Sequence, residues 1–163
     1  MAHSDIFLEV TGTRTGKVKG ESADAAHKDA MQVSGWRWGL DVPRDSAGQV
    51  YARRHHHRLE VIKKADRASP SLMSMLARNE LLKNVDLYVR KAGAKPLDYY
   101  VVKLEGGSIC ELATEQGAQS ELEIIETWSF AYERIEITYL PQRADGGGGG
   151  AVTFMDEVPH GES

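Results

Sequence analysis

The stretch LEIIETWSFAYERIEITYLP, residues 122–141, carries the longest run of alternating apolar residues in the chain. In its first half, five large apolar residues share one parity: Leu122, Ile124, Trp128, Phe130 and Tyr132. Those of its second half take the other parity: Ile135, Ile137 and Tyr139. A period of two is typical of a β-strand with one buried face. The phase change at Glu133 and Arg134 predicts a turn or bulge between two strands.

The same period recurs outward from this stretch, at residues 6–10, 31–42, 57–62, 85–91 and 97–105. The sequence AVTFMDEV, at 151–158, is typical of a closing strand. About eight to ten short strands indicate a mainly β fold, a β-barrel built from two antiparallel sheets. One domain spanning 1–163 suits a chain of this length.

One segment, SPSLMSMLARNELL at 69–82, departs from the strand pattern. Its apolar residues at helical spacing are Leu72, Met73 and Leu76. Ser69 is a candidate N-cap, Pro70 suits the first helical position, and Asn79 can end the helix in a left-handed conformation. A short flanking α-helix is therefore expected over about 70–79.

Two further segments lack regular patterns. The polar sequence DVPRDSAGQVYAR, at 41–53, predicts a flexible loop, and five consecutive glycines at 146–150 predict a slack connector before the final strand.

Composition limits the partners. Twenty basic and 24 acidic residues give a formal net charge of -4, which argues against nucleic-acid binding. The single cysteine, Cys110, excludes an internal disulfide and a cysteine-based zinc site. With no export leader and no apolar run of membrane-spanning length, we expect cytoplasmic folding and no membrane insertion.

The histidine cluster in ARRHHHRLEV, residues 52–61, suggests a metal site at first sight. Strand alternation places His55 and His57 on the face of Leu59 and Val61, and two imidazoles at this spacing can share an ion. A zinc site usually needs a third protein ligand. The remaining histidines, His3, His27 and His160, lie in segments that read as mobile or terminal. We therefore expect no bound metal and a polar strand end.

Catalytic chemistry has no support either. The chain contains no Gly-x-Ser-x-Gly elbow, and Cys110 lies beside Ile109 in an apolar strand. No complete catalytic set or cofactor motif can be assembled, so neither an enzyme nor a cofactor is expected.

Six strings taken in order resemble the haemolysin-coregulated protein (Hcp) family, the tube subunit of the bacterial type VI secretion system. They are IFLEV at 6–10, KGES at 19–22, WRWGL at 36–40, KKADRASPSLM at 63–73, VRKAG at 89–93 and PQRADGG at 141–147. Each string alone is weak, but their order and spacing span nearly the whole chain. The histidine cluster, the glycine run and the tail DEVPHGES depart from the resemblance.

The resemblance implies hexameric rings that stack head to tail into an inner tube. Contraction of a surrounding sheath ejects this tube, so a cytoplasmic protein reaches the extracellular space without a signal peptide. The implied partners are further copies of the chain, the spike protein at the tube tip, sheath and baseplate proteins, and effector proteins carried in the lumen.

A loop as long as 41–53 is unusual in a compact barrel unless it has a use. We expect it to contact the next ring, through Asp41, Arg44, Asp45, Tyr51 and Arg53. The alternative function is a monomeric or dimeric small-ligand or regulatory β-barrel, which predicts an enclosed apolar pocket.

Overall fold

The computed structural model describes residues 4–91, 96–117, 123–142 and 149–159, and this part contains eleven strands and one helix. The elements are β1 (Ser4–Gly12), β2 (Gly16–Lys17), β3 (Met31–Val33), β4 (Gly35–Arg37), β5 (Leu40–Asp41), β6 (His55–His56), β7 (Leu59–Lys64), α1 (Ser69–Ala77), β8 (Leu82–Lys91), β9 (Leu97–Glu115), β10 (Ile125–Tyr139) and β11 (Val152–Glu157). The predicted strand at 31–42 is divided among β3, β4 and β5, so the number of strands exceeds the expectation.

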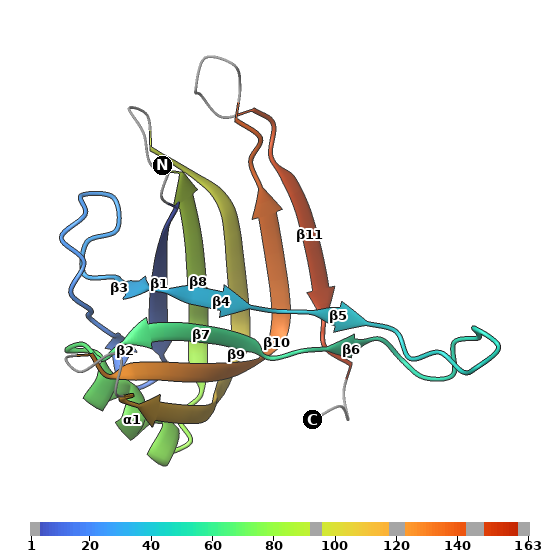
Figure 1. The fold of residues 1–163 in the computed structure, drawn as a ribbon, viewed down its shortest axis with the longest axis horizontal. Helices are drawn as coiled ribbons and strands as arrows, with labels where there is room; N and C mark the ends of the chain where they lie inside the picture. Colours follow the sequence, from blue (N-terminus) through green and yellow to red (C-terminus); the bar gives the residue numbers. More distant parts are fainter. Residues whose placement is uncertain (1–3, 92–95, 118–122, 143–148, 160–163) are drawn as a thin grey trace.

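Nine strands form one antiparallel sheet that closes on itself. Its order is β2-β1-β8-β9-β10-β7-β4, with β3 against β1 and β11 against β10. Only Ser34 separates β3 from β4, and its backbone N–H donates to the carbonyl of Ile62 at 2.7 Å. Residues 31–37 therefore bridge β1 and β7 and close the barrel (Figure 1). Strands β5 and β6 form a separate small sheet, and the prediction of a mainly β protein with antiparallel sheets and one short helix is confirmed.

Strand β10 runs unbroken through the predicted phase change. The buried parity does switch, from Trp128, Phe130 and Tyr132 to Ile135. The prediction of two separate strands is wrong, because Glu133 and Arg134 lie inside one bent strand of 15 residues. The neighbour on one side changes instead: β10 pairs with β7 over 125–130 and with β11 over 134–139.

The bend in β10 is matched by two glycines in β9. Gly106 has a φ of 57°, a left-handed conformation that favours glycine. Gly107 is paired with Tyr132, and a Cβ added to it would overlap the backbone carbonyl of Ala131. A bulge follows at Cys110, since Phe130 pairs with Ile109 and Ser129 with Glu111. Glycines and bulges bend a sheet sharply, so these residues turn the sheet back on itself.

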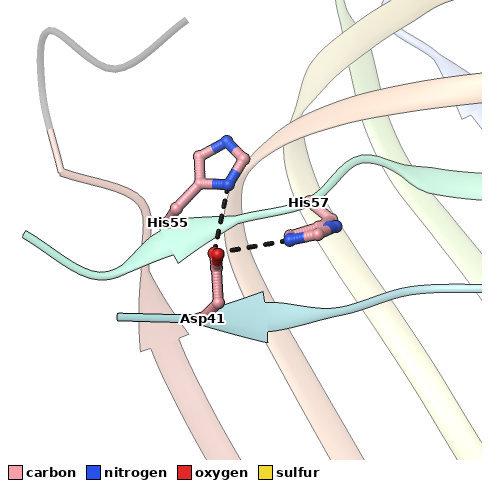
Figure 2. A group of neighbouring side chains, drawn as sticks. All are labelled: Asp41, His55 and His57. Atoms are coloured by element: carbon pink, nitrogen blue, oxygen red, sulfur yellow. Dashed lines mark hydrogen bonds and ion pairs between the residues drawn. The ribbon is translucent and has the colours of Figure 1, made fainter. Parts of the chain in front are cut away.

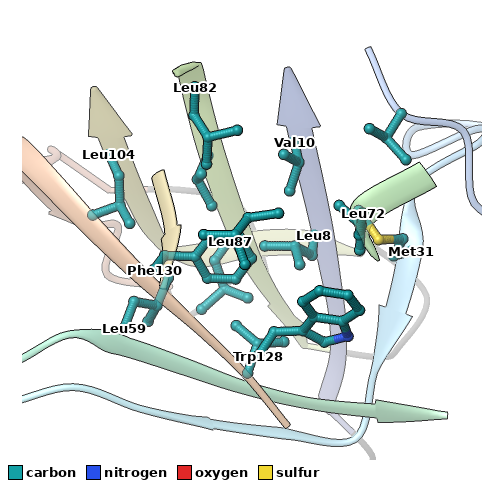
Figure 3. Close-up of a cluster of buried hydrophobic side chains, with 14 of the residues drawn as sticks. Leu8, Val10, Met31, Leu59, Leu72, Leu82, Leu87, Leu104, Trp128 and Phe130 are labelled. Carbon is teal, nitrogen blue, oxygen red and sulfur yellow. The ribbon is translucent and has the colours of Figure 1, made fainter. Parts of the chain in front are cut away.

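Apolar side chains from both halves of the sheet fill the barrel. The labelled members of this core in Figure 3 are Leu8, Val10, Met31, Leu59, Leu72, Leu82, Leu87, Leu104, Trp128 and Phe130. All of them are buried, and Trp128 and Phe130 are among the largest fully buried side chains. Burial of side chains of this size contributes about 1.5–3 kcal/mol each to folding.

Helix α1 closes one end of the barrel (Figure 1). Its buried face holds Ser69, Leu72 and Met75, whereas Met73 is exposed, contrary to the predicted pattern. The N-cap is Ala68 and not Ser69, because the helix already begins at Ser69. The backbone N–H of Ala68 donates to Asp66 Oδ1 at 2.9 Å. Asn79 ends the helix with a φ of 53°, as predicted.

A buried ionic cluster fastens this helix to the barrel. Lys63 Nζ lies 2.9 Å from both Asp66 Oδ1 and Glu126 Oε1. Ser69 Oγ and Trp128 Nε1 also donate to Glu126, at 2.9 and 3.0 Å. Burial alone would raise the pKa of Glu126, but these hydrogen bonds and the charge of Lys63 outweigh it and lower the pKa. Lys63, Asp66 and Ser69 lie in the KKADRASPSLM string, whereas Glu126 and Trp128 come from β10, so sequence patterns alone gave no sign of the cluster.

No helix among the described residues is both long and apolar enough to span a lipid bilayer.

Replacing Glu126 by Gln should destabilise the fold by about 3 kcal/mol, because removal of one partner leaves the buried charge of Lys63 only partly compensated by Asp66. Guanidinium unfolding followed by tryptophan fluorescence measures this. The control is Glu123→Gln, which removes an exposed pair with Lys64 and should change stability by less than about 0.5 kcal/mol. Equal effects of the two substitutions would contradict the role given to the buried cluster.

Replacing Gly107 by Ala should cost about 2–3 kcal/mol, because the new Cβ meets the backbone of Ala131 and cannot be relieved by a side-chain movement. Thermal unfolding monitored by circular dichroism tests this. Gly35→Ala is the matched control in another strand, where a Cβ has open space. A Gly107 variant as stable as the Gly35 variant would show that the sheet does not need this close approach.

Candidate functional site at the projecting hairpin

Residues 40–56 form a hairpin that extends away from the barrel (Figure 1), and we call it the projecting hairpin. At its base, Leu40 pairs with His56 and Asp41 with His55. Further out, Arg44 and Val50 form an isolated bridge. The segment predicted as a flexible loop thus contains its own antiparallel pairing.

The tip of the projecting hairpin is folded by local hydrogen bonds. Asp45 Oδ1 accepts the backbone N–H groups of Ala47 and Gln49 at 3.0 and 2.8 Å. Gly48 has a φ of 82°, and its carbonyl accepts Arg44 Nη1 at 3.1 Å. Two of the residues expected to contact the next ring, Arg44 and Asp45, therefore also shape the turn.

Apolar side chains on the projecting hairpin are exposed. They are Leu40, Val42, Val50 and Tyr51, and Tyr51 is the most open, at 68%. Arg53 is exposed as well. Four large apolar residues exposed on one thin element form a surface that favours contact with another protein.

Tyr132 of the barrel forms hydrogen bonds to the residues that flank both ends of the projecting hairpin. The Tyr132 hydroxyl accepts Trp38 Nε1 at 2.6 Å and donates to the carbonyl of His57 at 2.7 Å. Burial raises the pKa of Tyr132 to about 12, with an opposing effect from the Trp38 hydrogen bond and a smaller increase from the charge of Asp156. The hydroxyl therefore stays protonated near neutral pH and keeps its donor bond.

Strand β11 supplies a second anchor. Asp156 accepts two hydrogen bonds from Arg54, at 2.6 and 2.8 Å, and lies 2.9 Å from His56 Nε2. The Arg54 bonds are the main reason that the pKa of Asp156 falls to about 2, while burial opposes the shift and His56 adds to it. The His56 side chain is almost fully buried. Through Asp156, strand β11 is therefore joined to the base of the projecting hairpin.

The face predicted for the histidines is wrong. His55 and His57 are exposed, while Leu59 and Val61 are buried. The backbone leaves the β5–β6 pairing before it enters β7, so alternation does not continue from one strand to the next. Exposed Asp41, expected to contact the next ring, faces both histidines: its Oδ1 lies 3.2 Å from His55 Nδ1 and 3.4 Å from His57 Nε2 (Figure 2).

Comparisons with known proteins identify the family. The family model described as "Type VI secretion system effector, Hcp" matches residues 7–139. The chain is 26% identical to "Protein hcp1" of Pseudomonas aeruginosa over 155 residues, which cover 92% of each protein.

Solved structures agree. The "crystal structure of Hcp1 from Salmonella typhimurium" has a TM-score of 0.75 and 27% identity, covering 96% of this chain and 95% of that one. The "Structure of a type six secretion system protein" shares the fold, with a TM-score of 0.80, 21% identity and 92% coverage of both chains. The family is structural and non-enzymatic, in agreement with the prediction that the chain is not an enzyme. With the family model matching most of its length, the chain belongs to the Hcp family of the type VI secretion system.

Proposed function

We propose that this chain is the inner-tube subunit of a type VI secretion system. Copies close into a hexameric ring, and rings stack head to tail inside a contractile sheath. Contraction ejects the tube, with a spike protein at its tip, from the cytoplasm to the extracellular space. Effector proteins travel in the lumen, and sheath and baseplate proteins are further partners. Family membership supports this proposal.

The projecting hairpin is the observation that carries the stacking proposal. It leaves the barrel on one side, and its tip is folded by its own hydrogen bonds. Val50 and Tyr51 are exposed in the single subunit. Burial of these apolar side chains against another molecule would lower the free energy by about 25 cal/mol per Å² of apolar surface. A head-to-tail contact of this kind repeats along an axis.

A second apolar surface supports side-to-side contact within a ring. After the bend in β10, residues 134–139 of this strand pair with β11, and no other described strand pairs with β11. Direct pairing places Val152 beside Tyr139 and Phe154 beside Ile137, on the face that carries buried Ile135 lower down. Val152, Phe154 and Tyr139 are exposed. The core face of the sheet therefore continues past the barrel, where a neighbouring copy can cover it.

The alternative of a small-ligand barrel has less support. Large side chains such as Trp128, Phe130 and Met31 fill the barrel. A cleft among the described residues, lined by Glu21, Lys64 and Asp66, is open and charged, unlike an enclosed apolar pocket.

Replacing both Val50 and Tyr51 by Glu should abolish ring stacking and leave single rings intact, because each contact between rings would then have to bury two carboxylates in place of apolar side chains. Electron microscopy of the purified protein distinguishes stacks from single rings. Met73→Glu is the control, an exposed apolar residue on helix α1. Loss of the rings themselves would show that the projecting hairpin belongs to the contact within a ring. Unchanged stacks would show that it takes no part in the contact between rings.

Replacing both Val152 and Phe154 by Glu should convert rings to single subunits, because it introduces charge into the side-to-side contact. Sedimentation velocity measures the change from a ring mass to the 18.0 kDa of one chain. Thr153→Glu lies on the opposite face of the same strand and should retain rings. Rings that persist in the double variant would show that another surface joins the subunits.

A further inference from the structure

Three potential metal ligands meet at the base of the projecting hairpin. Asp41 comes from β5, His55 from β6, and His57 follows two residues later. One ligand atom from each residue lies within 4.8 Å of the other two. Figure 2 shows the carboxylate between the two imidazole rings. Strand pairing brings the group together, since Asp41 is directly opposite His55.

The separations suit a small transition-metal ion. Zinc binds imidazole nitrogen and carboxylate oxygen at about 2.1 Å, so ligands in a tetrahedral shell lie about 3.4 Å apart. Asp41 Oδ1 is 3.2 Å from His55 Nδ1 and 3.4 Å from His57 Nε2. Two of the three separations therefore already match a tetrahedral site. Two imidazoles with one carboxylate form a ligand set suited to divalent zinc, nickel or copper.

We propose that Asp41, His55 and His57 bind a divalent transition cation such as Zn²⁺. The expectation of no metal depended on the lack of a third ligand among the other histidines. Asp41 provides that ligand from the opposite arm of the projecting hairpin, 14 residues before His55. Sequence spacing alone gave no sign of this pairing.

The backbone around the site limits the positions of the ligands. His57 donates its N–H to the carbonyl of Gly39 at 3.0 Å, which continues the β5–β6 pairing. A Cβ on Gly39 would lie 3.3 Å from His57 Nδ1, so glycine leaves room for the ring. All three side chains are about half exposed, which leaves further coordination positions open to water or to an outside ligand.

Binding would join the two arms of the projecting hairpin. The ion would cross-link β5 to the end of β6 and close residues 42–54 into a loop. Closure of this kind reduces the conformational freedom of the segment it encloses. Any effect on ring stacking rests on the proposed function, whereas binding of the ion does not.

Isothermal titration calorimetry with Zn²⁺ alone tests the proposal. The protein carries no affinity tag, is treated with EDTA and dialysed, and contains His3→Gln and His160→Gln to remove the terminal histidines. We expect one ion per chain with a Kd on the order of micromolar, corresponding to about 8 kcal/mol. Asp41→Asn and His57→Gln should each weaken binding at least tenfold. His27→Gln, at a histidine that contacts Asp98 and not the projecting hairpin, should stay within twofold.

Limited trypsin digestion gives a second readout. Zn²⁺ should slow cleavage after Arg44 and Arg53 at least threefold in the parent protein, and not in the His57→Gln variant. Absence of saturable Zn²⁺ uptake would overturn the proposal. So would an affinity of the Asp41→Asn and His57→Gln variants for Zn²⁺ equal to that of the parent protein. Because calorimetry and digestion are independent of stacking, a failure here leaves the proposed tube function to be judged by microscopy.

Discussion

The close approach of two backbones at Gly107 and Ala131 is the constraint on which the rest of the structure depends. It allows β9 and β10 to bend together without a break in their pairing. Below the bend, the sheet closes through β7 and the segment 31–37 around the large core side chains. Above it, the same two strands continue outward, and β10 pairs with β11. The two halves of the bent sheet therefore face each other around one core, with Leu104 and Ile135 from above the bend and Trp128 and Phe130 from below it. The exposed side chains of Val152 and Phe154, on β11, lie beyond this core.

Both proposed assembly surfaces are attached to strand β10 of this bent pair. Tyr132, at the bend, holds the two arms of the projecting hairpin through its hydroxyl. Asp156, on β11, fixes the same base through Arg54 and His56. The strand proposed to contact a neighbour within the ring thus also supports the element proposed to contact the next ring.

The sequence was sufficient for the fold class, the position of the helix and the parity switch in β10, because local periodicity reflects which face is buried. It did not show that β10 is continuous, since a bend and a break produce the same phase change. Contacts between distant segments were also out of reach: Glu126 with Lys63, Asp156 with Arg54, and Asp41 with His57. Each depends on strand pairing, which local patterns do not specify.

Cryo-electron microscopy of the purified wild-type protein would show whether this chain works by assembling with identical copies. We expect six-fold rings with an open centre, in which the adjacent subunit covers the β10–β11 face and the projecting hairpin contacts the next ring. Isolated subunits at micromolar concentration, or hairpins folded against their own barrel, would contradict this expectation.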